Sequence, residues 1–452
     1  MKNKHNKAMK KTFALGGVHP HDHKISAGSA IENFPVLERA YISMAQHLGA
    51  PAEPVVAKGD RVVVGQLIGK PSGFMSACIH SSVSGTVASI EPVADLAGNL
   101  VKTVIIDVEG DEWDPAIDRS PEVVREIKLT KEEILKRIAD CGIVGLGGAS
   151  FPTHIKLTPP PGKKADFLLI NGAECEPYLT SDHRIMLEMP EQILIGARLM
   201  MKALGVSKCL FGVEENKPDA IASLRRFSKE YPEIEIVSLK KKYPQGGEKQ
   251  LIDALIGRRV PAMGLPIDAG AVVQNCGTAL AVYEAVQKNK PLFEGIVTVT
   301  GDCTEQQRNF RLRVGTPFDK MLDAVGGLPE KAAKLISGGP MMGKAVANIQ
   351  APSVKSTSAL LVLTEEQTLR KARTQCIRCG KCVQVCPMGL EPYLLNRLVK
   401  ASRMEDLETN RIQDCIECGC CLYTCPAQLP LLDNIRVGKA QVIRILRSRP
   451  KK

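Results

Sequence analysis

The sequence lacks any apolar run of the length that a membrane span requires. A transmembrane helix needs about 18 or more consecutive apolar residues, whereas the longest candidate run here, residues 359–363, has the length of a strand. Hydrophobic residues make up 44% and charged residues 24% of the chain, which is the composition of an ordinary globular protein. The sequence therefore predicts a soluble or peripheral protein, and its 452 residues predict about three or four domains.

Aromatic residues are also scarce, and only one of them is Trp. The formal charge is +11, and residues 431–452 hold seven Lys or Arg against one Asp. No groove-reading motif accompanies these basic residues, which argues against nucleic acid as a partner. The basic residues are better explained by contact with an anionic membrane leaflet or with an acidic redox partner. The other interpretation is that they form the solvent-exposed face of a terminal helix and bind no partner.

We also expect no secretory signal peptide, and the 15 cysteines are therefore not expected to form disulfides. Eight of them lie in two runs of the form C-x2-C-x2-C-x3-C-P, which start 39 positions apart. Structural zinc sites pair two C-x2-C knuckles or add histidines, and neither run contains a histidine. The ligands of the first run are Cys376, Cys379, Cys382 and Cys386, and those of the second are Cys415, Cys418, Cys421 and Cys425.

This spacing is typical of [4Fe-4S] ligands, in which three thiolates hold one cube and the fourth cysteine ligates the other cube. The sequence therefore predicts two [4Fe-4S] clusters that exchange their fourth ligands. Cys425 completes the cluster of the first run, and Cys386 completes that of the second. Cys420 falls outside the spacing and is interpreted as a spare thiol.

Residues 54–107 are predicted to form short strands separated by turns. The stretches KGDRVVVGQLIG and SSVSGTVASI resemble the half-repeats of lipoyl and biotinyl carrier domains, which implies a barrel-sandwich fold. Carrier domains present a modifiable lysine on the hairpin between the halves, where this chain has residues 73–78, GFMSAC. We therefore expect this domain to be structural.

Between residues 130 and 290 the signals for helices and strands alternate. A helix over 131–140 with Thr130 as its N-cap and a strand over 167–170 are followed by a helix over 191–204 that ends at Gly205. A further strand is predicted over 209–213. Alternation of this kind predicts a parallel, Rossmann-like sheet with helices on both faces.

From residue 296 a second β pattern begins. It contains a strand over 297–301 and a helical stretch over 317–325, and it returns at residues 335–343. One short helix among strands suits a β-grasp module of the soluble-ligand-binding (SLBB) kind. Residues 352–358 are interpreted as the linker to the cluster domain.

Four further stretches of the middle region could build one pocket. Glycines are dense in residues 142–153, where backbone N–H groups could converge on a phosphate. Residues 171–177 follow a predicted strand, at the edge of a parallel sheet where ligands collect. Residues 246–248 and 274–278 add amide, acid and backbone donors. Each stretch alone could be a turn, but together with the cysteine runs they indicate a cofactor pocket that delivers electrons to iron and sulfur.

The motifs of this region resemble those of a known flavoprotein. GLGGASFPTHIKL, NGAECEPYLTSDHRIM and QNCGTA are similar to the FMN and NADH loops of the flavoprotein subunit of respiratory complex I. The whole chain, including GGVHP, HLGAPAEPVVAKGD, GGPMMG and the paired cysteine runs, resembles the RnfC family, also called RsxC, the electron-input subunits of Rnf membrane complexes.

The resemblance implies roles for individual residues. FMN phosphate would lie on Gly145, Gly147, Gly148 and Lys156. The ribityl chain and ring edge would lie near Asn171, Glu174, Gln274 and Asn275. Phe151 and the two predicted catalytic residues, Glu176 and Glu248, would lie at the nicotinamide end. Ala173 and Gly277 stand where the complex I flavoprotein has acids.

The resemblance also implies a multidomain fold of α/β and β parts. The predicted units are a barrel-sandwich domain (1–115), an FMN- and NADH-binding α/β domain (116–290), a β-grasp SLBB module (291–351) and an α-helical, ferredoxin-like domain with two [4Fe-4S] clusters (352–452).

The predicted function is that of a peripheral subunit on the cytoplasmic face of the cell membrane. Such a subunit oxidises NADH on noncovalent FMN and passes single electrons through two [4Fe-4S] clusters to a partner subunit. The resemblance places this step in NADH:ferredoxin oxidoreduction coupled to Na+ or H+ translocation. Flavin is needed because hydride carries two electrons and each cluster takes one. The alternative is an electron-transfer and docking subunit that has clusters but no working FMN or NADH site.

Overall fold

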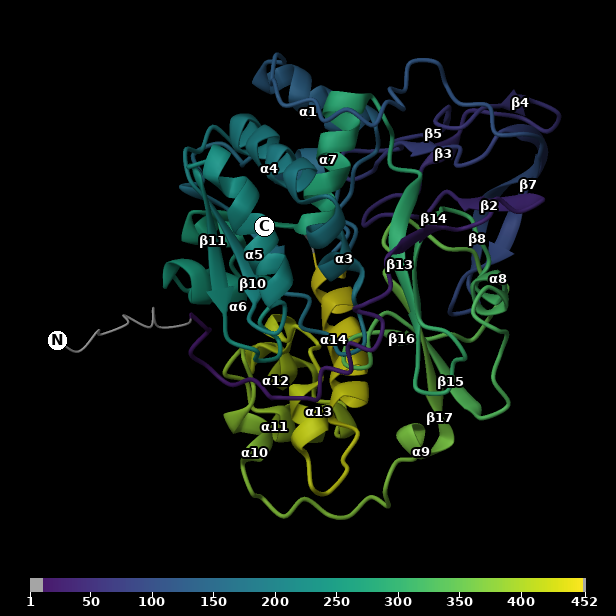
Figure 1. Ribbon diagram of the computed structural model, residues 1–452. Coiled ribbons are helices and arrows are strands. Elements are labelled where there is room, and N and C mark those ends of the chain that lie inside the picture. Colours follow the sequence, from purple (N-terminus) through teal and green to yellow (C-terminus); the bar gives the residue numbers. More distant parts are fainter. Residues whose placement is uncertain (1–10, 450–452) are drawn as a thin grey trace.

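The centre of the molecule is a parallel sheet with helices on both faces (Figure 1). The computed structural model describes residues 11–449. The strand order is β11–β10–β9–β12, with β9 at Phe167–Gly172, β10 at Cys209–Glu214, β11 at Ile234–Leu239 and β12 at Ala271–Asn275. Leu168 and Ile170 pack in the core on one face of the sheet, and Leu169 packs in the core on the other. Both faces of β9 are buried, which explains why its sequence is a continuous apolar run.

The helices divide unequally between the two faces. One face is covered by α1 (Lys131–Asp140), α3 (Ser181–Glu188), α4 (Pro190–Leu204), α5 (Pro218–Phe227) and α7 (Cys276–Lys288), and the other by α6 (Glu248–Ile256). Thr130 caps α1 in a capping box with Glu133, as predicted. Gly205 ends α4 in the left-handed conformation at φ 72°, which confirms the predicted end of that helix.

The N-terminal domain consists of two small antiparallel sheets around a shared core. The first has the order β2–β8–β7–β4 and the second β3–β5–β6. Their strands are β2 (Arg39–Ser43), β3 (Glu53–Pro54), β4 (Arg61–Val62), β5 (Leu67–Lys70), β6 (Ile79–His80), β7 (Gly85–Ala94) and β8 (Leu100–Val108). Ile42, Ile68 and Val104 meet in one core. The hairpin at the carrier-lysine position carries Phe74, whose side chain is 83% exposed.

A third unit is a mixed sheet of six strands with one helix on it. Its order is β1–β14–β13–β17–β15–β16, and its strands are β1 (Ile31–Asn33), β13 (Glu294–Thr300), β14 (Arg308–Arg313), β15 (Ala332–Ser337), β16 (Lys344–Ala345) and β17 (Ala359–Thr364). The helix α8 (Phe318–Asp323) packs its buried side chains against β13 and β17. The sheet therefore includes β1 and β17, which the predicted boundaries assigned to the domains on either side.

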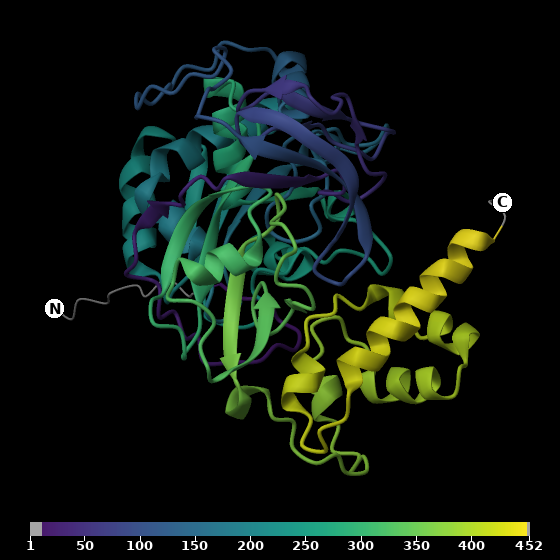
Figure 2. The ribbon, with the colours of Figure 1, turned by 90° about the vertical axis from the view of Figure 1, so that its right-hand side faces the viewer.

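The C-terminal domain is helical and projects from the rest of the molecule (Figure 2). Its helices are α10 (Lys381–Gln384), α11 (Pro392–Lys400), α12 (Met404–Thr409), α13 (Cys420–Thr424) and α14 (Leu431–Ser448). The short helix α9 (Glu365–Thr368) precedes this domain and packs on β15 and β17. The two cysteine runs repeat the same backbone, because Arg378 and Glu417 both have φ 56° and the glycines that precede α10 and α13 have φ 73° and 77°. Within residues 11–449, no helix combines the length and the apolarity needed to cross a bilayer.

Residues 11–29, which we call the N-terminal strap, connect the central sheet to the cluster domain. Val18 forms two backbone hydrogen bonds with Tyr243, which follows β11, at 2.8 and 2.9 Å. Gly17 N donates to Val385 O at 2.9 Å. Lys24 Nζ donates to the carbonyl oxygens of Glu174, Glu176 and Leu179 at 2.9, 2.8 and 2.5 Å. The strap thus holds the acid-containing loop after β9 and contacts the first cysteine run.

A buried lysine joins three parts of the chain. Lys355 is 3% exposed, and its Nζ donates to Cys78 O in the barrel-sandwich domain and to Gly142 O before the glycine loop, each at 2.7 Å. Burial lowers the pKa of Lys355 to about 7. The ammonium has no carboxylate partner among residues 11–449, so protonating it in the folded state is costly.

Lys355 should make the stability of the protein depend on pH. Its pKa is about 7 when folded and about 10.4 when unfolded. Between these values the unfolded chain binds more protons, so the free energy of unfolding should rise with pH by up to about 1.4 kcal/mol per pH unit. Urea unfolding at pH 7, 8 and 9 would measure the free energy of unfolding of wild type and of Lys355→Met. The value for wild type minus the value for the variant should increase with pH. Lys344→Met, at an exposed lysine, is the control. A difference in the free energy of unfolding between wild type and Lys355→Met that stays constant with pH would contradict the lowered pKa.

Candidate flavin and iron–sulfur sites

The predicted cofactor loops meet at one edge of the central sheet. Asn171 and Asn275 are register partners at the carboxyl ends of the neighbouring parallel strands β9 and β12. Asn171 Nδ2 donates to Gly246 O at 2.9 Å, and Asn275 Oδ1 accepts from Gly277 N at 2.7 Å as the N-cap of α7. Three of the predicted stretches, 171–177, 246–248 and 274–278, are therefore neighbours, which their separation in the sequence does not reveal.

The glycine loop closes over the same edge. Val144 pairs with Pro152, and Gly145 N donates to Phe151 O at 2.9 Å, so the loop is a tight hairpin before the short helix α2 (Thr153–Lys156). Leu146 N donates to Thr278 Oγ1 at 3.0 Å, which ties the loop to α7. The glycines between these anchors keep their backbone exposed to the edge of the sheet.

Two glycines of this loop differ in what surrounds them. A Cβ on Gly147 would lie 3.0 Å from Asn275 Cβ, which is closer than ordinary packing. Gly148 has φ 153°, and a Cβ added there would meet no atom within 4 Å, so its peptide faces open space. On the neighbouring strand β12, Gln274 is 2% exposed and its Nε2 has no hydrogen-bond partner among residues 11–449. An unpaired buried amide and open glycine peptides are features that a polar ligand would satisfy.

The acid loop after β9 is fixed by buried charges. Glu174 has φ 45°, and its Oε1 accepts from Asp182 N, at the start of α3, at 2.7 Å. Its Oε2 lies 3.6 Å from Lys24 Nζ. Burial, together with the charge of Glu174, raises the pKa of Asp182 to about 7, and Asn275 Nδ2 donates to Asp182 Oδ2 at 2.7 Å. Glu174 and Asn275, which the family resemblance predicts near the ring edge, are thus connected through Asp182.

The two predicted catalytic glutamates lie in different surroundings. Glu248 is the first residue of α6, and its Oε1 accepts from Lys156 Nζ at 2.5 Å, so the predicted phosphate lysine is paired with a predicted catalytic acid. Glu176 accepts from Met341 N at 3.0 Å and from Met342 N at 2.8 Å, in the turn between β15 and β16. Burial raises the pKa of Glu176 to about 7.

Tyr243 connects this region to the cluster domain, and sequence reasoning missed it. Its side chain is 2% exposed. Its Oη donates to Cys418 O at 2.9 Å and lies 3.5 Å from Glu176 Oε1. No periodicity or motif marks this tyrosine, and only its position before Pro244 and the glycines at 246 and 247 hints at an ordered turn. Glu176 and Tyr243 form what we call the junction between the cofactor loops and the second cysteine run.

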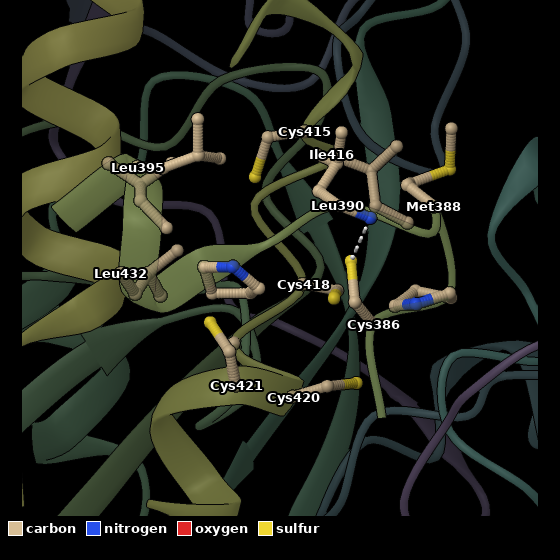
Figure 3. A pocket seen from close by; sticks show the side chains of 14 residues that line it. Cys386, Met388, Leu390, Leu395, Cys415, Ile416, Cys418, Cys420, Cys421 and Leu432 are labelled. Carbon is tan, nitrogen blue, oxygen red and sulfur yellow. Dashed lines mark hydrogen bonds between the residues drawn. The ribbon is translucent and has the colours of Figure 1, made fainter. Parts of the chain in front are cut away.

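Four of the predicted ligand cysteines surround one cavity (Figure 3). The Sγ atoms of Cys415, Cys418 and Cys421 face it together with that of Cys386 from the first run. Cys420 also lines the cavity, and its Sγ lies 4.0 Å from Tyr243 O. Apolar side chains such as Leu390, Leu432 and Ile435 complete the lining. Leu390 N donates to Cys386 Sγ, and Glu417 N to Cys415 Sγ, each at 3.4 Å. Burial raises the pKa of the Cys415 thiol to about 11.

The donor set of this cavity fits a cluster, because thiolates that receive backbone N–H bonds within an apolar shell are the environment of [4Fe-4S] centres. The grouping of Cys386 with the second run is the one that the exchange of fourth ligands requires. The assignment of the ligands stays a prediction.

Of the remaining four predicted ligand cysteines, only two lie close together. Cys382 lies near Cys425 in the core of the cluster domain. Cys376 and Cys379 are exposed on the loop that leads into α10. No group of three or more His, Cys, Asp or Glu in residues 11–449 is arranged to hold a single metal ion.

Family models match four consecutive parts of the chain. They are the RnfC barrel sandwich hybrid domain at residues 11–111, the Nuo51 FMN-binding domain at 138–284, the SLBB domain at 296–345 and the 4Fe-4S dicluster domain at 368–426. These matches confirm the predicted fold class, and they confirm FMN and two [4Fe-4S] clusters as its cofactors.

Two solved structures resemble the chain in part. Both are of an NAD+-reducing [NiFe]-hydrogenase, in the H2-reduced and the air-oxidized state. They are 19% and 17% identical to the chain, with TM-scores of 0.48 and 0.49, and the match covers 70% and 71% of this chain and 66% and 68% of theirs.

Curated relatives are much closer in sequence. The C subunit of the proton-translocating ferredoxin:NAD(+) oxidoreductase complex of Clostridium ljungdahlii is 44% identical over 86% of this chain and 85% of its own length. The C subunit of the Na(+)-translocating complex of Acetobacterium woodii is 44% identical over 95% and 96%. The C subunit of the ion-translocating oxidoreductase complex of Rhodobacter capsulatus is 41% identical over 94% and 82%. The chain therefore belongs to the RnfC family, the C subunits of Rnf complexes.

Proposed function

We propose that this protein oxidises NADH on noncovalently bound FMN and passes the electrons one at a time through two [4Fe-4S] clusters to another subunit of an Rnf complex. The overall reaction is NADH:ferredoxin oxidoreduction coupled to Na+ or H+ translocation, and the subunit works at the cytoplasmic face of the membrane. The observation that carries the proposal is the junction, because Glu176 and Tyr243 join the cofactor loops to the backbone of Cys418.

FMN, when bound, accepts the two electrons of hydride and releases them singly. The exposed peptides at Gly147 and Gly148 would receive its phosphate, with Gly145 holding the base of the loop through its hydrogen bond to Phe151. The unpaired Gln274 Nε2 would donate to its polar edge. Asn171, Glu174 and Asn275 hold the surrounding loops in place through the hydrogen bonds described above. Phe151, half-buried between the glycine loop and α2, would pack at the nicotinamide end.

The two predicted catalytic glutamates take different roles in this proposal. Glu248 holds Lys156 and so sets the position of the ammonium that would meet the phosphate. The carboxylate of Glu176 accepts the N–H groups of Met341 and Met342. We therefore place the role of Glu176 at the junction, where it fixes the distance between the cofactor loops and the nearer cluster.

The two clusters differ in position. The cluster held by Cys415, Cys418, Cys421 and Cys386, the inner cluster, would lie against the junction. The cluster held by Cys376, Cys379, Cys382 and Cys425, the outer cluster, would lie at the exposed loop. Electrons should therefore reach the inner cluster first and leave the protein from the outer one.

The basic C-terminal segment contributes less free charge than its sequence indicates. Arg436 and Lys439 pair with Glu417, and Arg449 pairs with Glu408. Residues 450–452 lie outside the described part of the chain. Residues 431–449 therefore use three of their five basic side chains within the cluster domain, and attachment to partners is expected to involve other surfaces as well.

The proposed function can be tested on the subunit alone. Protein purified without oxygen should release FMN on denaturation and should reduce an artificial one-electron acceptor with NADH. Clusters without FMN and without NADH oxidation would support the alternative, a docking subunit with no working flavin site.

Gly147→Val should abolish FMN binding. The new Cβ would already crowd Asn275 at 3.0 Å, and its methyl groups would occupy the place predicted for the phosphate. We expect FMN content to fall by about tenfold or more, measured as flavin released per folded protein. Gly73→Val is the matched control, because a Cβ at this position meets no atom within 4 Å. Full FMN content in folded Gly147→Val would remove the phosphate assignment.

Cys425→Ala should damage the outer cluster, and Cys386→Ala the inner one, because each run would supply the fourth ligand to its neighbour. Iron content and EPR spectra of the two variants should therefore resemble those of Cys376→Ala and Cys415→Ala, respectively. Cys420→Ser is the control and should keep both clusters. If Cys425→Ala instead reproduced the spectrum of Cys415→Ala, each run would hold its own cluster.

A further inference from the structure

The loop that carries the first two cysteines is almost completely exposed. Residues 369–381 run from the end of α9 to the first residue of α10 along the lower edge of the molecule (Figure 1). Every residue of this loop is exposed except Gly380, which is half-buried. Cys376 and Cys379 lie within it, so the outer cluster would sit directly beneath the surface of the protein.

This loop is strongly basic. Residues 369–381 contain five Lys or Arg and no Asp or Glu. Arg370 pairs with Asp433 at 2.8 Å. The other four form no ion pair with any residue in the described range 11–449, and they flank the exposed cysteines on both sides: Lys371, Arg373, Arg378 and Lys381. Their charge is therefore available to a partner.

The repeat within the cluster domain provides an internal comparison. Arg378 and Glu417 occupy the same position in the two cysteine runs and share φ 56°. Glu417 is paired with Arg436 and Lys439, whereas Arg378 is exposed and unpaired within residues 11–449. Lys381 in the first run corresponds to Cys420 in the second, which is fully buried. At matching positions of the same backbone, the second run therefore has a paired acid and a buried cysteine, whereas the first run has two exposed basic side chains.

Exposed apolar side chains lie among these charges. Ile377 is 67% exposed and Leu369 is 68% exposed, and Tyr423 on α13, which packs against α10, is 55% exposed. Ile416, the counterpart of Ile377 in the second run, is half-buried. Apolar residues surrounded by charge are the usual anatomy of a protein–protein interface.

We propose that residues 369–381 and Tyr423 form the electron-exit surface, which docks the acidic face of a one-electron acceptor protein. The proposal rests on the proposed function, because it takes the outer cluster as the last centre in the chain. One electron leaves the reduced cluster and reduces the acceptor, with no bond made or broken. An anionic membrane would also attract the basic residues, but it would cover the exposed cysteines with lipid and leave the electron no acceptor. A protein occupant is therefore favoured.

The test uses the full chain with both clusters, reduced chemically under anaerobic conditions and then separated from excess reductant. Reduced protein is mixed in a stopped-flow instrument with an acidic ferredoxin or with a basic cytochrome as the acceptor. Because the electrons do not come from NADH, a failure of the flavin site would leave this measurement intact, so the two proposals fail separately.

We expect the rate of ferredoxin reduction to fall by about tenfold or more from about 50 mM to about 500 mM salt, since steering by charge is screened. The double variant Lys371→Glu with Arg373→Glu should show a loss of about tenfold at low salt and should gain rate with the basic cytochrome. Lys331→Glu with Lys344→Glu, which makes the same charge change at exposed lysines elsewhere, should behave as wild type. Iron content and EPR spectra verify that the clusters are intact.

Equal ferredoxin rates in wild type and in Lys371→Glu with Arg373→Glu, together with intact clusters, would overturn the proposal. It would also be overturned if the double variant lost binding to phosphatidylserine vesicles but kept the ferredoxin rate, because the surface would then be a membrane contact.

Discussion

The hydrogen bond from Tyr243 to the backbone of Cys418 is the contact on which the architecture depends. It joins a tyrosine that follows a strand of the central sheet to a predicted cluster ligand, and it does so inside the protein, where such a bond is strong and costly to lose. Glu176, the turn after β15 and the N-terminal strap converge on the same place. Four separate parts of the chain therefore fix one distance, between the cofactor loops and the inner cysteines.

The cluster domain is a duplicated unit whose two copies have diverged in their surroundings. Both runs share positive φ values at Arg378 and Glu417 and at the glycines that follow them. The second copy packs against the junction and has a paired acid. The first copy has basic residues and faces outward. In the proposed function, this asymmetry would give the electron path a direction, from the buried copy to the exposed one.

Much of the fold was predictable because its signals are local. The capping box at Thr130, the glycine at 205 and the cysteine spacing each act within a few residues. Contacts between distant residues were not predictable. The roles of Tyr243, Lys24 and Lys355 come from partners 150 or more residues away, and no pattern encodes such pairs. Pairing between distant segments also explains why β1 and β17 belong to a sheet outside their predicted domains. The ion pair between Lys156 and Glu248 is likewise visible only in the structure.

The most direct test of the account is the order in which the clusters are reduced by NADH. Rapid mixing of the subunit with NADH, followed by freezing and EPR, would be carried out on wild type, Cys425→Ala and Cys386→Ala. If electrons pass through the junction, the inner cluster should be reduced at the wild-type rate in Cys425→Ala, and the outer cluster should receive almost no electrons in Cys386→Ala. Reduction of the outer cluster at the wild-type rate in Cys386→Ala would contradict this expectation, because the junction would then not lie on the electron path.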